Sequence, residues 1–220
     1  MRALGDLIDD VVEHDERKLF FCHRQEDGQA KRPKMPFIEH SKRIKQVAVK
    51  REAVRQKGAK AIVLRLDMGE GAGFEAFKEK VIHFLDSEWG TKSFDYLVNN
   101  AGFLPQAALV ENTTEELFGA CMRVLFKGPY FLTRSLLPFL ADGGSIVDVT
   151  TNAIFQQALA QGCAAYASMK GGMTVLTSYM AKEFSDRRIR VNSVAPGATR
   201  TRIAMTPMKS TRGLPNIWPA

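Results

Sequence analysis

A tyrosine and a lysine stand four residues apart in the stretch CAAYASMKGG, at Tyr166 and Lys170. On a helix this spacing places both side chains on one face. A phenol titrates at about pH 10, which is too high for easy proton exchange at neutrality. A nearby ammonium favours the phenolate and lowers its pKa, so the pair could work as an acid–base group. The other interpretation is an exposed tyrosine and lysine on an ordinary helix, and the surrounding elements must decide between the two.

The elements that position this pair alternate between helix and strand from residue 42 onward. Apolar residues at helical spacing, and short apolar runs closed by turn residues, predict four helices and four strands. The helices are predicted at residues 42–58, 73–90, 113–144 and 163–188, and the strands at 59–68, 94–102, 143–151 and 189–197. Thr113 and Glu116 have the spacing of a capping box at the start of the third helix. Gly128 and Pro129 predict a bend inside it.

Strands separated by helices indicate an α/β fold with a doubly wound parallel sheet. In such sheets, ligands bind beyond the carboxyl ends of the strands. Four motifs fall at those ends: Asp67, the NNAG turn at residues 99–102, the pair Thr150 and Thr151, and a Pro-Gly turn at residues 196–197. Their convergence on one edge favours a functional site over an ordinary exposed pair.

These motifs, in this order, resemble the short-chain dehydrogenase/reductase family. The resemblance covers the chain from about Lys42 to Thr201 and rests on DM after one strand, NNAG after the next, YxxxK on a helix and PGATRT after the last strand. It implies a Rossmann-like fold and an NAD(P)-dependent oxidoreductase. Such an enzyme passes a hydride between the nicotinamide and a small-molecule carbonyl/alcohol pair, with a tyrosine as acid/base.

The resemblance implies three catalytic positions. Tyr166 resembles the family's acid/base, and Lys170 resembles the lysine that tunes it and binds the nicotinamide ribose. The family's serine usually lies 13 residues before the tyrosine, where this chain has Ala153. Thr151 takes that position if the following loop carries two extra residues, and its hydroxyl can donate the same hydrogen bond. Thr150 is the alternative.

The resemblance also implies a set of cofactor-binding positions along the same edge. The aspartate contacts the adenine, the small residues of NNAG let the turn approach the adenosine half, and PGATRT holds the nicotinamide carboxamide. The full set is Asp67, Met68, Asn99, Asn100, Ala101, Gly102, Tyr166, Lys170, Pro196, Gly197, Thr201 and Arg24. Arg24 ends the strand-like KLFFCHR and suits the 2′-phosphate of NADP, which is therefore the expected cofactor, with NAD as the alternative.

The chain departs from the family pattern in three places. The TGxxxGxG turn that meets the pyrophosphate is not found, and residues 2–24 resemble the family's first helix and second strand. We therefore expect the first and last strands of the sheet to be lacking, with the neighbours of the first strand unpaired unless they close the gap. Leu125 stands where the family carries an asparagine for a proton relay. A leucine cannot hold a relay water.

Length and composition predict one domain at residues 1–220, with an atypical N-terminus at 1–41, a recognisable core at 42–201 and a loose tail at 202–220. No apolar run approaches a membrane span and no signal peptide is recognisable, so a cytoplasmic protein is expected. Three cysteines and four histidines form no metal-ligand pattern, so no metal is expected.

Three function hypotheses remain open. The first is the oxidoreductase, acting as a homodimer or homotetramer. The second is an inactive, truncated relative that serves as a non-catalytic or interaction protein through the family's helix interface. The third is nucleic-acid binding by the basic residues at 31–60, within a net charge of +7. No aromatic interleaving accompanies that charge, so a solvated helix face is the simpler interpretation and no nucleic-acid partner is expected.

Overall fold

The computed structural model describes residues 20–23, 62–103 and 105–197. Five strands lie in this part of the chain, and all the pairings between them are parallel. They are β1 (Phe20–His23), β2 (Ile62–Arg65), β3 (Phe94–Asn99), β4 (Leu140–Val149) and β5 (Arg190–Val194). The expected α/β fold with a parallel sheet is confirmed.

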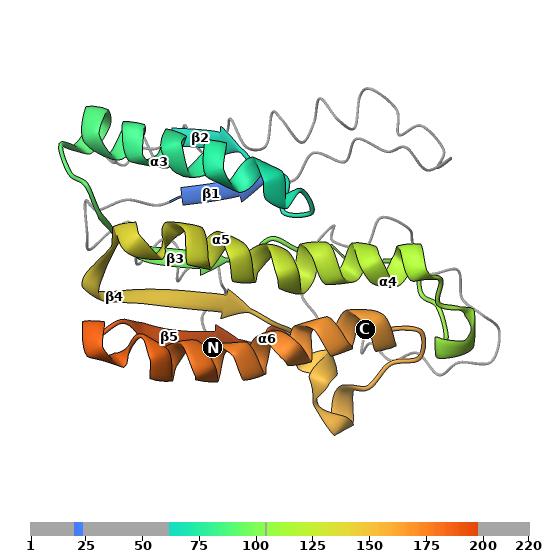
Figure 1. Cartoon of the computed structure of the whole chain (residues 1–220). Helices are drawn as coiled ribbons and strands as arrows, with labels where there is room; N and C mark the ends of the chain where they lie inside the picture. The colour runs from blue at the N-terminus through green and yellow to red at the C-terminus, as the bar shows by residue number, and fades with distance from the viewer. Residues whose placement is uncertain (1–19, 24–61, 104, 198–220) are drawn as a thin grey trace.

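The five strands form two groups (Figure 1). β1 pairs with β2, and β3, β4 and β5 pair in that order. Among the described residues, β1 and β3 are not hydrogen-bonded to each other, and no strand bridges them. This division agrees with the expectation that the strands on either side of the family's first strand stay unpaired. The helices predicted before residue 59 lie outside the described residues.

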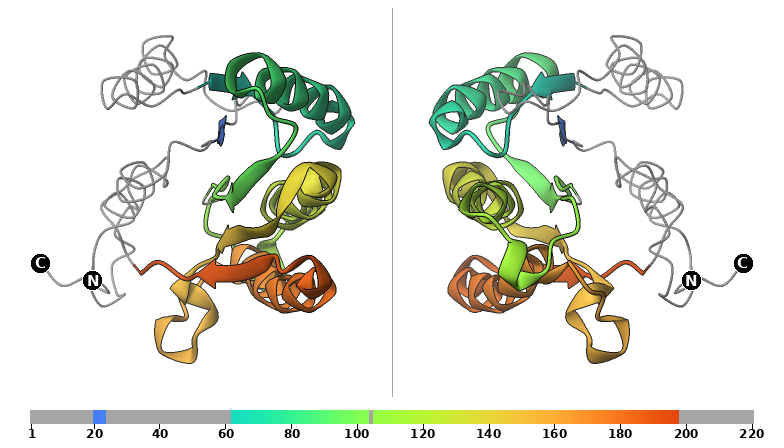
Figure 2. Two further views of the ribbon diagram at one scale, coloured as in Figure 1. Left: turned by 90° about the vertical axis from the view of Figure 1, so that its left-hand side faces the viewer. Right: turned by 90° about the vertical axis from the view of Figure 1, so that its right-hand side faces the viewer.

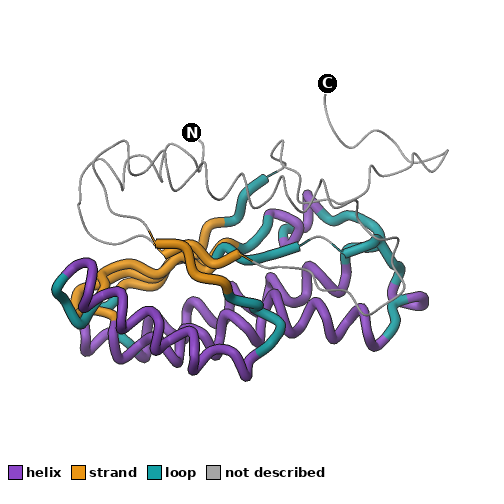
Figure 3. Tube along the Cα trace, turned by 90° about the horizontal axis from the view of Figure 1, so that it is seen from above, coloured by secondary structure: helices purple, strands orange, loops and turns teal. Residues whose placement is uncertain are grey.

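The described helices cover one face of the strands (Figures 2 and 3). Short 3-10 turns connect several of them to the strands. The main helices are α3 (Phe74–Trp89), α4 (Glu115–Met122), α5 (Gly128–Leu136) and α6 (Ala164–Glu183). Apolar residues at helical spacing on α3 and α5 join apolar residues of β3 and β4 in one hydrophobic core. Its fully buried members include Val81, Leu85, Phe94, Leu132, Leu140 and Ile146.

The segment from α4 to α5 differs from the prediction at its cap, and a π-helical segment interrupts it next to the position where a bend was predicted. Thr114, not Thr113, is the N-cap, and its hydroxyl accepts a 3.2 Å hydrogen bond from the backbone N–H of Leu117. Thr113 instead donates its hydroxyl to the carbonyl of Leu109. The capping-box interpretation was therefore off by one residue. A π-helical segment, Arg123–Lys127, joins α4 to α5 immediately before Gly128 and accounts for the irregularity there.

Gly128 has a packing role that its sequence position does not reveal. A Cβ placed there would lie 2.3 Å from the carbonyl oxygen of Met68 and 2.9 Å from that of Arg123. Both neighbours are backbone atoms, so neither can rotate away. The start of α5 therefore approaches the turn after β2 closely enough that only glycine fits.

We predict that Gly128→Ala destabilises the fold by about 2–3 kcal/mol, because an added methyl group overpacks a rigid contact. Gly119→Ala on α4 is the matched control. Its Cβ would meet only the movable end of Arg123, at 3.1 Å, so the helix should gain about 0.5–1 kcal/mol instead. Urea unfolding of both variants measures the difference. Equal stability of the two variants would contradict the close contact at Gly128.

Candidate active site

The carboxyl ends of three strands meet at one edge, as parallel pairing requires. Asn99 of β3 lies opposite Asp148 of β4, and Val149 of β4 lies opposite Val194 of β5. The loops that follow these strands therefore start side by side. The loop after β4 is tied to the loop after β5 by a 3.1 Å hydrogen bond from the N–H of Asn152 to the carbonyl of Pro196.

The Tyr166–Lys170 pair lies near the start of α6, as predicted. Tyr166 is half-buried and packs against the apolar core, while Lys170 is only 5% exposed. The Lys170 Nζ donates a 2.6 Å hydrogen bond to the carbonyl of Val149, the last residue of β4. The interpretation of an exposed surface pair is therefore wrong, because the lysine is buried and bound to the strand end.

The two threonines after β4 have different roles. Thr150 donates its hydroxyl to the carbonyl of Val194, at 3.0 Å, and so ties β4 to β5. The hydroxyl of Thr151 accepts a 3.2 Å hydrogen bond from the N–H of Ala153 and lies near enough to the Tyr166 side chain to lower the pKa of its phenol. The structure thus brings Thr151 together with Tyr166 and Lys170, while Thr150 is committed to the sheet.

The pKa of Tyr166 differs in direction from the sequence-based expectation. Burial of the phenol raises its pKa above the ordinary value, and a hydrogen bond with Thr151 partly offsets that rise. The thiol of Cys163, three residues earlier on the chain, raises the pKa further. The sequence-based prediction of a lowered pKa for Tyr166 took into account only the charge of Lys170. In the structure desolvation dominates, so the phenol stays protonated at neutral pH.

Burial acts on Lys170 in the opposite sense. Desolvation of the ammonium lowers the pKa of Lys170 from an ordinary 10.5 to about 8, and the carboxylate of Asp148 counteracts part of this shift. A group that titrates at about 8 exchanges protons at physiological pH. Strongly shifted groups of this kind gather at functional sites.

Asp148 is a buried residue that the sequence analysis missed. It faces the helix layer and is held by an amide and a hydroxyl: Asn99 Nδ2 donates to one carboxyl oxygen and Thr177 Oγ1 to the other, both at 2.8 Å. Asn99 also donates to Thr133 Oγ1, at 3.0 Å. The signal in the sequence was a single acidic residue within the apolar run SIVDV, since a buried carboxyl group needs dedicated partners.

The NNAG turn divides between the core and the edge. Asn99 is buried in the hydrogen-bond network just described, and Asn100 and Gly102 are exposed. A Cβ at Gly102 would lie 3.8 Å from the Lys170 Nζ and 3.7 Å from the Leu125 side chain. The turn therefore passes directly beside the lysine. Leu125 is fully buried there, so this side of Lys170 is apolar.

The remaining predicted positions spread along the same edge. Asp67 accepts a 2.8 Å hydrogen bond from the N–H of Gly69, which closes the turn after β2. The Met68 side chain is buried in the core, so only its backbone faces the loop. Pro196 and Gly197 follow β5 beside Asn152. Ala101 is half-buried, while Arg24 and Thr201 lie outside the described residues.

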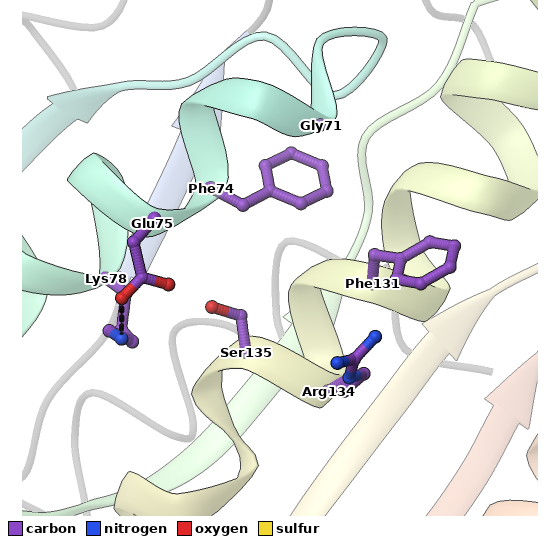
Figure 4. Close-up of a pocket in the computed structure, with 7 residues that line it drawn as sticks. All are labelled: Gly71, Phe74, Glu75, Lys78, Phe131, Arg134 and Ser135. Carbon is purple, nitrogen blue, oxygen red and sulfur yellow. Dashed lines mark hydrogen bonds and ion pairs between the residues drawn. The ribbon is translucent and has the colours of Figure 1, made fainter.

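A second surface feature lies away from this edge. A groove between α3 and α5 is lined by Gly71, Phe74, Glu75, Lys78, Phe131, Arg134 and Ser135 (Figure 4). It shares no residue with the strand-end site, and an ion pair joins Lys78 to Glu75, three residues earlier on α3, along one of its walls. In the described part of the chain, no group of three side chains could hold a metal ion. No helix among those residues is long and apolar enough to cross a membrane.

Comparison with known proteins gives consistent matches over most of the chain. A family model described as "Enoyl-(Acyl carrier protein) reductase" matches residues 40–218. An uncharacterized oxidoreductase of Bacillus subtilis, YxbG, is 31% identical over 151 residues, which are 68% of this chain and 52% of that protein. Versicolorin reductase 1 of Aspergillus parasiticus is 30% identical over 151 residues, 68% of this chain and 54% of its own length. The chain thus spans about half the length of these relatives.

A solved structure of the angucycline C-6 ketoreductase LanV with bound NADP superimposes with a TM-score of 0.68 at 28% identity. The superposition covers 74% of this chain and 62% of LanV. It identifies the parallel sheet and its helices as those of a dinucleotide-binding fold.

The burial of Lys170 makes a prediction about stability and pH. Below about pH 8 the ammonium is charged in both states, so its burial destabilises the folded state in full. Between about pH 8 and pH 10.5 the folded protein has released the Lys170 proton and the unfolded chain has not, so the free energy of unfolding rises with pH. Above pH 10.5 the side chain is neutral in both states, and burial of a charge no longer destabilises the fold. Relative to Lys170→Met, the wild type should therefore gain about 3 kcal/mol across this window. Urea unfolding at several pH values measures it, and a difference independent of pH would contradict the lowered pKa.

Proposed function

Since the chain belongs to the short-chain dehydrogenase/reductase family, we propose that it is an NADP-dependent oxidoreductase that reduces the carbonyl group of a small molecule to an alcohol. The observation that carries this proposal is the convergence of Tyr166, Thr151 and Lys170 at the carboxyl end of β4. A proton donor, a second hydroxyl and a buried amine are the groups that a carbonyl reduction needs beside its hydride source.

The bound nicotinamide would supply a hydride to the carbonyl carbon, and this chain would supply the proton to the carbonyl oxygen. Tyr166 is the proton donor, because burial keeps its phenol protonated at neutral pH. Its O–H bond breaks as the alcohol O–H bond forms, and the resulting phenolate is later reprotonated from solvent. Thr151 donates its hydroxyl to the same substrate oxygen and so fixes its orientation. The ammonium of Lys170 favours the phenolate that this transfer leaves behind.

The residues along the edge suit the nicotinamide-ribose half of a dinucleotide. The Lys170 Nζ lies beside the exposed turn at Gly102 and can donate to ribose hydroxyls on that side. Asn100 is exposed in the same turn, and Pro196 and Gly197 follow β5 beside Asn152. Arg24, assigned to the 2′-phosphate, lies outside the described residues. NADP in LanV supports the choice of NADP over NAD, and parallel titration with NADPH and NADH tests it.

A non-catalytic relative is the second candidate. Leu125 favours it, because this fully buried leucine stands beside Lys170 where the family places a proton-relay asparagine. Saturable NADPH binding, followed by nicotinamide fluorescence, discriminates between the two candidates. An oxidoreductase binds in the micromolar range, whereas a pure scaffold shows no saturation below millimolar cofactor.

We predict that Tyr166→Phe lowers the turnover of a ketone substrate by about 10²–10⁴-fold, because the proton donor is removed. NADPH binding, measured by fluorescence, should change little, since the phenyl ring still fills the same space. A Tyr166→Phe variant with wild-type turnover would overturn the assignment.

The neighbouring threonines offer a matched pair. Thr151→Val removes the hydroxyl beside Tyr166 and should lower turnover by about 10-fold or more. Thr150→Val removes a hydroxyl of the same size that is bonded to Val194, so it should cost about 1 kcal/mol of stability and leave turnover near wild type. Equal losses of turnover in the two variants would contradict the role of Thr151.

A homodimer is part of the proposal. Four large apolar side chains are exposed on the adjoining helices α4 and α6, and burying them against a second copy would remove this surface from water. They are Phe118, Met122, Val175 and Tyr179.

We predict that Val175→Glu converts the dimer into a monomer in sedimentation, because the new carboxylate cannot be buried in the interface. Val110→Glu is the control, since Val110 is exposed outside both helices and should leave the dimer intact. A wild-type monomer at micromolar concentration would contradict this assembly.

A further inference from the structure

Asp148 has no solvent-exposed surface, and its hydrogen-bond partners carry no charge. Asn99 Nδ2 and Thr177 Oγ1 each donate to one of its carboxyl oxygens at 2.8 Å. Burial of the carboxyl raises the pKa of Asp148, and the ammonium of Lys170 acts against that rise. A buried carboxylate with only neutral donors therefore depends on the lysine for its charge balance.

The protons in this cluster can be counted. Thr177 Oγ1 lies 2.8 Å from Asp148 Oδ2 and also 2.8 Å from the carbonyl oxygen of Met173, yet it has one proton to donate. Both amide protons of Asn99 are already used, one on Asp148 and one on Thr133. The single Thr177 proton cannot serve both acceptors at once, so the carboxyl group of Asp148 is held by neutral donors alone.

The surroundings leave Lys170 as the ionic partner. Asn99 of β3 and Thr177 of α6 donate hydrogen bonds to Asp148, and Ser193 lies opposite it in register on β5. Thr133 of α5 is bonded to Asn99. All four of these side chains are neutral. Around Lys170, the described neighbours from other elements are the carbonyl of Val149, the Gly102 turn and the apolar Leu125. Tyr166, on its own helix, is neutral at physiological pH.

We propose that Asp148 is a positioning residue whose negative charge holds Lys170 in its protonated form, and thereby sets the pH range in which Tyr166 can exchange a proton with substrate. The role in catalysis rests on the proposed function, whereas the charge coupling does not. The two groups meet at the end of β4. Asp148 is the residue before Val149, and the carbonyl of Val149 accepts the hydrogen bond from the Lys170 ammonium. No other acidic group acts on Lys170 within the described residues.

Asp148→Asn isolates the charge from the packing. An asparagine there can still accept from Asn99 through its oxygen. Its Nδ2 can donate to Thr177 Oγ1, which then donates its proton to the carbonyl of Met173. Every hydrogen bond of the cluster is kept while the negative charge is lost.

The test is a pH titration of the Lys170 side chain by NMR, with ¹³Cε-labelled lysine and the signal assigned through Lys170→Met. It needs neither cofactor nor substrate. In the wild type Lys170 should titrate at about 8. In Asp148→Asn the midpoint should fall by about one pH unit or more, since an adjacent opposite charge is removed. Asp86→Asn, the same change at an exposed position of α3, should leave it in place. An unchanged midpoint in Asp148→Asn would overturn the proposal.

The reciprocal variant keeps the proposal testable if Asp148→Asn does not fold. Coupling between two titrating groups is symmetric, so Lys170→Met must raise the titration midpoint of the Asp148 carboxyl group by a similar amount. The ¹³Cγ signal of Asp148 measures that midpoint. The same Asp148 midpoint in wild type and Lys170→Met would overturn the coupling.

If the couplings hold but NADPH does not bind, the proposed function alone fails. If the enzyme is active, the limb of its kcat/KM–pH profile that reports Lys170 should move with the NMR midpoint in Asp148→Asn.

Discussion

The hydrogen bond from Lys170 to the carbonyl of Val149 is the interaction on which the site depends. It fastens α6 to the carboxyl end of β4, and it does so with a charged group that is 5% exposed. An ammonium in that position is costly unless a counter-charge lies nearby. Asp148 provides that charge, and its own hydrogen bonds reach β3 through Asn99 and return to α6 through Thr177. The hydrogen bonds of these two buried residues therefore join the sheet, the helix and the candidate active site.

This arrangement explains why the reacting groups sit where they do. Parallel pairing brings the ends of β3, β4 and β5 to one edge, and the tie through Thr150 keeps the loop after β4 in register with β5. Thr151 is then presented to Tyr166 rather than used within the sheet. The π-helical segment before Gly128 packs Leu125 against the same lysine, so the environment on that side is apolar. Desolvation consequently dominates the titration of both Tyr166 and Lys170.

The sequence predicted the elements whose signal is local. The 3.6-residue periodicity placed Tyr166 and Lys170 on one helix, and apolar runs placed the strands, because both patterns depend only on which face is buried. It misplaced the helix cap at Thr113, since two adjacent threonines offer the same chemistry. It also gave the wrong direction for the pKa of Tyr166, because burial is a property of the packed structure. Asp148 was missed for the same reason: its partners lie 29 and 49 residues away.

The most direct measurement of the central claim is the transfer of deuterium from NADPH that carries deuterium at both positions of nicotinamide C4 to a panel of aromatic ketones, in a single turnover with excess protein. Mass spectrometry of the product shows whether the new carbon–hydrogen bond carries the label. The account predicts labelled alcohol from the wild type and at least about a hundredfold slower transfer in Tyr166→Phe. Saturable NADPH binding without any labelled alcohol, or equal transfer by the two proteins, would contradict it.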